Sequence, residues 1–107
     1  MAEVPLEILK ALKEYIAELS ENIPVSSAIL FGSYATGTYT KESDIDIAIF
    51  SNDFSNTDRI NAGAFLLKKS RKFKLDIQPL PFGSEELNNK DRNPFIKQIL
   101  KTGIQIG

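Results

Sequence analysis

Two apolar segments separated by a polar stretch constrain this chain more than any other feature. The first runs from residue 25 to 31 and ends at Gly32-Ser33. The second begins at Asp44-Ile-Asp46, after ten intervening residues. An apolar run that ends at a glycine is typical of a buried strand, and the alternation of 44–50 is typical of a strand with one buried face. The pattern predicts two strands whose adjoining ends carry polar groups.

The two aspartates have a simple electrostatic consequence. On a strand Asp44 and Asp46 lie on one face, with Cα atoms roughly 6.6 Å apart. Like charges at this spacing repel unless something neutralises them. Mg²⁺ does so well, because it takes oxygen ligands and shares its shell with substrate phosphates. The alternative is that the aspartates are solvated or protect a sheet edge from aggregation.

The Gly32-Ser33 pair is a candidate phosphate site. Gly32 has no Cβ, so a phosphate could approach its backbone closely. Ser33 offers a hydroxyl where a short helix over 34–38 could begin, and backbone amides at a helix start favour anions. Tyr34 and Tyr39 flank this pair and could stack on a base or be structural aromatics.

These motifs resemble the signature of the minimal nucleotidyltransferases, a family of the DNA polymerase beta-like nucleotidyltransferase superfamily. The resemblance covers Gly32-Ser33, Asp44-x-Asp46, Ser43 and the apolar residues around both motifs. It implies an α/β (α+β) nucleotidyltransferase fold, in which about four helices flank a mixed sheet of three to four strands. It also implies a third carboxylate on a later strand, which Asp76 fits. One departure is Thr36, where many members carry a basic residue.

The resemblance further implies a reaction and a role for each residue. The enzyme would move a nucleoside monophosphate, AMP above all, from a nucleoside triphosphate such as ATP to a hydroxyl. Asp44 and Asp46 would bridge two Mg²⁺ ions, and Asp76 would hold the catalytic ion and accept the proton of the hydroxyl. Gly32 and Ser33 would hold the terminal phosphates.

Composition limits the other chemistries. The 107 residues include no cysteine and no histidine, which excludes thiolate nucleophiles, disulfides and histidine acid–base catalysis. The net charge of −1 argues against non-specific nucleic-acid binding. With 42% hydrophobic residues and no apolar run near 20 residues, we expect one domain over 1–107, no membrane span and a cytoplasmic location.

The acceptor follows from the resemblance and the small size. The family implies a HEPN-domain protein, often a toxin encoded beside a minimal nucleotidyltransferase antitoxin, with AMP added to a partner tyrosine. Homo- and hetero-oligomers both remain open. The alternative is a non-enzymatic protein that senses nucleotide or blocks its partner by contact alone.

The remaining segments predict the supporting elements. A helix over 5–20 would bury Leu6, Leu9, Leu12, Ile16 and Leu19. A helix capped by Asn56 or Thr57 would run to about Lys72 and bury Ile60, Ala64 and Leu67, with Phe65 or Leu66 nearby. A third strand over 73–80 would end at Pro79 and Pro81. A last helix over 94–102, capped by Asn93, would precede an edge strand over 104–106.

A cluster of five cations is the one strong charge feature, and it comprises Lys68, Lys69, Arg71, Lys72 and Lys74. Cations at a helix C-terminus oppose the helix dipole, so a solvated helix end is one interpretation. A contact with a partner or a triphosphate is the other.

Overall fold

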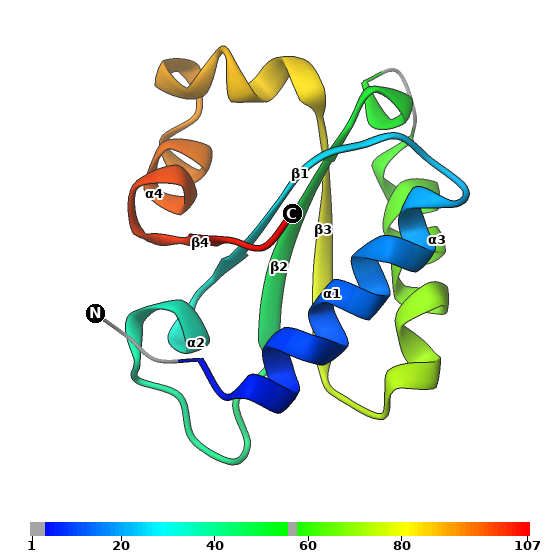
Figure 1. Ribbon diagram of the computed structural model, residues 1–107. Helices are drawn as coiled ribbons and strands as arrows, with labels where there is room; N and C mark the ends of the chain where they lie inside the picture. The colour runs from blue at the N-terminus through cyan, green and yellow to red at the C-terminus, as the bar shows by residue number, and fades with distance from the viewer. Residues whose placement is uncertain (1–3, 56–57) are drawn as a thin grey trace.

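A four-stranded mixed sheet forms the centre of the molecule, in a computed structural model that describes residues 4–55 and 58–107 (Figure 1). The strand order is β3-β2-β1-β4. The strands are β1 (Val25–Phe31), β2 (Ile45–Ser51), β3 (Ile77–Gly83) and β4 (Ile104–Gln105). β1 is antiparallel to β2 and β4, and β2 is parallel to β3. The predicted mixed α+β sheet is confirmed.

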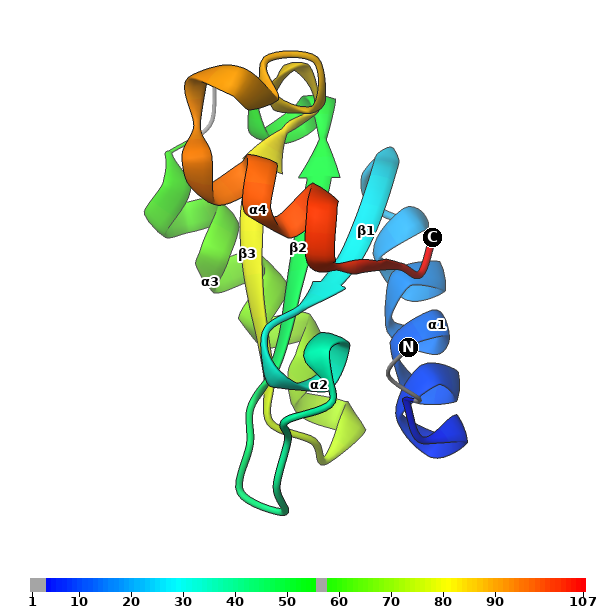
Figure 2. The same cartoon turned by 90° about the vertical axis from the view of Figure 1, so that its left-hand side faces the viewer.

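Helices cover both faces of this sheet (Figure 2). They are α1 (Leu6–Ser20), α2 (Ser33–Thr36), α3 (Arg59–Ser70) and α4 (Pro94–Thr102), with 3₁₀ turns at Asn52–Phe54, Arg71–Phe73, Ser84–Leu87 and Lys90–Arg92. α1 and α3 lie on one face and α4 on the other. None of the helices in the described part of the chain has the length and hydrophobicity of a membrane-spanning segment.

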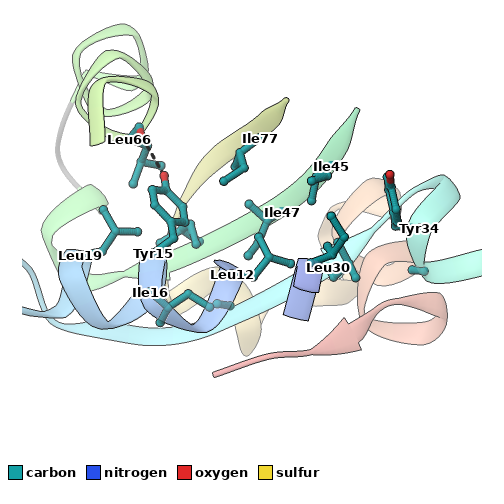
Figure 3. Packing of buried hydrophobic residues seen from close by; sticks show 14 residues of the cluster. Leu12, Tyr15, Ile16, Leu19, Leu30, Tyr34, Ile45, Ile47, Leu66 and Ile77 are labelled. Carbon is teal, nitrogen blue, oxygen red and sulfur yellow. Dashed lines mark hydrogen bonds between the residues drawn. The ribbon is translucent and has the colours of Figure 1, made fainter. Parts of the chain in front are cut away.

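The alternation of β2 divides its side chains between two cores. Ile45, Ile47 and Ile49 pack with α1 and α3 (Figure 3). Ala48 and Phe50 point to the other face, where they pack with Phe82, Ile96 and Ile99. Asn93 begins α4 as predicted, because its Oδ1 accepts hydrogen bonds from the amides of Phe95 and Ile96 at 3.0 and 3.4 Å. Both faces of β2 are therefore covered, which fixes the direction of every side chain on it.

The apolar stripe predicted for the first helix is partly wrong. Leu6 is 84% exposed, whereas Ile8 and Tyr15, absent from the predicted stripe, are buried. The contact face follows residues 8, 12, 15–16 and 19, because spacings of three and four residues bring these positions to one side of the helix.

The buried face predicted for α3 is mostly wrong, since Leu66 alone of the residues named for it is fully buried. Asp58 caps this helix, and its side chain accepts a hydrogen bond from the amide of Ile60 at 2.9 Å. Ala62, Leu66 and Ser70 face the core, while Ile60 and Leu67 are 80% and 42% exposed and Ala64 is exposed. The predicted caps Asn56 and Thr57 lie outside the described residues.

The bounds predicted for the third strand are also wrong. β3 begins at Ile77 and continues through Pro79 and Pro81 to Gly83. Proline normally interrupts a strand because it has no amide hydrogen, but β3 lies at the edge of the sheet. The amide of Ile45 donates to the carbonyl of Asp76 at 2.7 Å, so even-numbered residues of β3 bond to β2 and the prolines face the open edge.

Tyr15 supports a stability prediction. Its hydroxyl donates to the carbonyl of Leu66 at 2.7 Å in the core between α1 and α3 (Figure 3). We expect Tyr15→Phe to lower the free energy of unfolding by about 1–2 kcal/mol, because it removes one buried hydrogen bond. Burial raises the pKa of Tyr15, so the folded state holds this proton more tightly than the unfolded chain. The contribution of this raised pKa to the free energy of unfolding is complete below pH ~10 and is lost as pH rises further.

Urea denaturation at neutral and alkaline pH checks this prediction. Tyr39→Phe is the control, since it removes a hydroxyl from a partly exposed ring. The variant Tyr15→Phe should be less stable at neutral pH and should lose less stability than wild type above pH ~10. Equal stability of both variants at every pH would contradict the assigned role.

Candidate active site

Gly32 forms a sharp corner between β1 and α2. Its φ of 75° and ψ of −152° belong to a region that residues with a Cβ rarely adopt. The amides of Ala35 and Thr36 donate to its carbonyl at 3.1 Å, which starts α2, and Gly37 ends this helix at a φ of 84°. The short helix predicted after Gly32-Ser33 is therefore present over 33–36.

The corner lies directly against Asp46. Phe31 and Asp46 are partners in the β1–β2 ladder, so the residue after Phe31 turns beside the start of β2. A Cβ added at Gly32 would clash with Oδ2 of Asp46. A side chain at position 32 would force this carboxylate to move, and the two halves of the sequence motif thus form one site.

Asp44 and Asp46 act on each other electrostatically. Burial raises the pKa of Asp46, and the negative charge of Asp44 raises it further. Asp46 is half-buried in β2, whereas Asp44 lies just before the strand and is exposed. A cation near both carboxylates would relieve this repulsion.

The backbone of Asp76 lies near the start of β2, because its carbonyl accepts the hydrogen bond from the amide of Ile45. The amide of Ile77 donates to the carbonyl of Leu75 at 2.9 Å, and this tight turn places Asp76 before the strand. Strand alternation therefore does not fix the direction of its exposed carboxylate. Gln78, which pairs with Asp46, is exposed on the same face of the sheet.

The donor set suits magnesium bound together with a phosphate ligand. Within residues 4–55 and 58–107, no three acidic side chains lie close enough to form a metal cluster. Mg²⁺ commonly takes only one or two carboxylates and completes its shell with water and substrate phosphates. Asp44 and Asp46 supply that pair, and the backbone of Gly32 lies directly beside the carboxylate of Asp46.

The neighbouring polar and aromatic residues support the corner. Oγ1 of Thr36 donates to the carbonyl of Gly32 at 3.3 Å, so this side chain holds the turn. The rings of Tyr34 and Tyr39 stack with centroids 4.4 Å apart, and Tyr34 is only 9% exposed. Tyr34 is therefore a structural aromatic, and Tyr39 has one face covered.

Sequence reasoning missed Phe95 at this site. Its ring lies edge-on to Phe31 with centroids 5.7 Å apart, next to the Gly32 corner, and its side chain is 47% exposed. The contact joins α4 to β1 across 64 positions of the chain, so no local pattern indicates it.

Comparisons with known proteins agree with this geometry. A family model for a nucleotidyltransferase domain matches residues 9–105. Two proteins of Methanocaldococcus jannaschii, each named "Putative protein adenylyltransferase", are similar to the chain. One is 38% identical over 88% of this chain and 92% of its own length, and the other is 25% identical over 94% and 100%. A crystal structure from Sulfolobus solfataricus, described as a "putative nucleotidyltransferase", has the same fold. Its TM-score is 0.64 at 22% identity, over 98% of this chain and 89% of that one.

Proposed function

This chain belongs to the nucleotidyltransferase domain family and is a nucleotidyltransferase, and from that premise we propose that it transfers AMP from ATP to a hydroxyl of a partner protein. The observation that carries the proposal is the contact of Asp46 with the Cβ-free corner at Gly32, beside Asp44. This arrangement offers two carboxylates and an accessible backbone at one place. We further propose that residues 1–107 work as one catalytic domain.

The reaction joins the acceptor oxygen to the α-phosphorus of ATP. As this bond forms, the bond from the α-phosphorus to the bridging oxygen of the β-phosphate breaks, and pyrophosphate leaves. Phosphoryl transfer of this kind needs in-line positioning and neutralised charge more than covalent help from the protein. Bound Mg²⁺, as one ion or two, would supply that neutralisation and orient the entering and leaving oxygens.

The residues of the chain then have distinct tasks. Asp44 and Asp46 would hold the metal, and Gly32 and Ser33 would hold the terminal phosphates beside them. Asp76 is proposed to accept the proton of the acceptor hydroxyl, which requires its exposed carboxylate to turn toward the α-phosphate. A chain without histidine can carry out this reaction, because carboxylates and metal replace the usual acid–base pair.

A protein tyrosine is the proposed acceptor. The names of the two curated relatives support a protein acceptor in general. On the family resemblance we propose a tyrosine of a HEPN-domain partner, whose toxicity the modification would silence.

The test incubates the chain with a HEPN-domain partner, Mg²⁺ and ATP labelled at the α-phosphate. We expect label on a partner tyrosine, loss of the label when that tyrosine is changed to phenylalanine, and weaker transfer from the other three triphosphates. Mass spectrometry locates the adduct. A partner that is neutralised yet unmodified would contradict enzymatic silencing and favour blocking by contact.

A further inference from the structure

Helix α3 has apolar residues on two opposite faces. Ala62 and Leu66 face the core, whereas Ile60, Ala64 and Leu67 form a second stripe on the outer side. A surface helix needs one apolar stripe to pack on its domain. The second stripe is the one that periodicity indicates as buried, which suggests that another molecule covers it.

A groove of about 380 Å³ adjoins this outer stripe. Its lining includes Ile60 and Ala64 of α3, Pro79, Leu80 and Pro81 of β3, and Phe95 of α4. Ile60, Leu80 and Phe95 are 80%, 37% and 47% exposed, so three large apolar side chains face solvent around one hollow. Exposed apolar surface gathered in this way marks an interaction site.

Ring contacts connect the groove to the candidate active site. Phe95 contacts Phe82 at 6.3 Å between ring centroids on one side and Phe31, which precedes Gly32, on the other. Leu80 lies on the same face of β3 as Gln78, the partner of Asp46. A molecule in the groove would therefore reach the carboxylates without crossing the sheet.

The open edge of β3 excludes an added strand as the occupant. Strand addition requires backbone donors along the edge, and Pro79 and Pro81 remove two successive outward-facing amide hydrogens. A helix needs no such donors and can lay an apolar stripe into a groove.

The charges on α3 indicate which side chains a docked helix would carry. Lys68 in the last turn of α3 and Arg71 just after it are exposed, and they lie at the end of the helix that leads to Asp76 (Figure 1). In the part of the chain that the structure describes, neither has an acidic partner, whereas Lys72 pairs with Glu18. Acidic residues on the occupant would complement these two cations.

We propose that this groove docks an amphipathic, acidic helix of the acceptor protein and so presents its hydroxyl to the active site. Its apolar stripe contacts Ile60, Leu80 and Phe95, and its acidic residues lie beside Lys68 and Arg71. The role as an acceptor-docking site rests on the proposed function. The groove and the exposed cations at the end of α3 do not depend on that function.

Two designed peptides test the docking site. Both have about 18 residues, enough to form a helix, with a leucine stripe flanked by glutamates in one and by lysines in the other. We expect fluorescence anisotropy to show that the glutamate peptide binds wild type at least about tenfold more tightly than the lysine peptide. Ile60→Asp should weaken its binding at least about tenfold, as removal of a central anchor does.

Matched controls come from α1. Leu6→Asp adds the same charge at a residue that is 84% exposed and lies outside the groove, and it should leave binding unchanged. Lys68→Glu with Arg71→Glu should reverse the preference between the peptides, whereas Lys10→Glu with Lys13→Glu should not. Equal binding of the two peptides, or equal loss in Leu6→Asp, would overturn the proposal.

Two further measurements distinguish failure of the docking site from failure of the proposed function. Sedimentation should show that the free chain does not self-associate through Ile60. A dimer that Ile60→Asp abolishes would make a second copy of the chain the occupant of the groove, and it would overturn the proposal. Thermal stabilisation by Mg²⁺ and ATP should persist in Ile60→Asp. If the peptides dock as expected but wild type shows no response to nucleotide, the proposed function fails and the docking site stands.

Discussion

Replacing Asp46 by asparagine is expected to lower Mg²⁺-dependent AMP transfer by at least about a thousandfold. The carboxylate lies against Gly32 and beside Asp44, so its loss removes a negative ligand where metal and phosphates would meet. A metal contributes several kcal/mol to the stabilisation of transition-state charge, and each 1.36 kcal/mol corresponds to a factor of ten in rate. The measurement is the rate of transfer of α-labelled nucleotide to the acceptor.

The stability of Asp46→Asn shows whether its loss of transfer arises from the missing carboxylate or from unfolding. Burial and Asp44 raise the pKa of Asp46, so the contribution of this group to stability is present below its ordinary pKa and is lost as pH rises through the raised value. Asparagine stays neutral, and Asp46→Asn should therefore unfold at the same or a higher temperature than wild type at neutral pH without metal.

Asp91→Asn is the control for the substitution itself. Its side chain is 81% exposed and lies 3.7 Å from Lys97, and surface pairs of this kind contribute little. We expect wild-type transfer from Asp91→Asn. Full activity in Asp46→Asn, or its unfolding, would contradict the role given to this carboxylate.

Gly32→Ala is the second substitution with a large expected effect. The backbone conformation of Gly32 costs a residue with a Cβ about 1–3 kcal/mol, and the new methyl group would clash with Oδ2 of Asp46. We expect lower stability by that amount and a loss of transfer of at least about a hundredfold, because a displacement of this size moves a catalytic group. Urea denaturation and the transfer assay measure the two effects.

Gly63→Ala is the matched control. A Cβ at Gly63 meets nothing within 4 Å, and this residue lies inside α3. The same substitution there should raise the free energy of unfolding by about 0.4–1 kcal/mol, since it reduces the entropy of the unfolded chain. If Gly32→Ala behaved like Gly63→Ala, the close approach of Asp46 would not exist in solution.

The elements around the motif are those that sequence alone predicts well. The strand over 25–31, the short helix ended by Gly37 and the helix capped by Asn93 agree with the structure, because local patterns determine each of them. A glycine after a helix and an Asn-Pro helix start are short-range sequence signals.

The errors arise where tertiary position decides between local alternatives. On α3 the sequence offers two apolar stripes, and only the placement of the helix against the sheet selects Leu66 over Ile60. Pro79 and Pro81 indicate a strand end unless the strand is known to lie at an edge, which depends on the order of all four strands. Asp76 is placed before β3 by a turn at Leu75 that alternation does not reveal.

Anomalous scattering from a crystal grown with Mn²⁺ and a non-hydrolysable ATP analogue tests the central claim most directly. The account predicts a metal peak within bonding distance of both Asp44 and Asp46, with the terminal phosphates at the backbone of Gly32 and Ser33. A metal bound elsewhere, or a triphosphate that lies away from this corner, would contradict it.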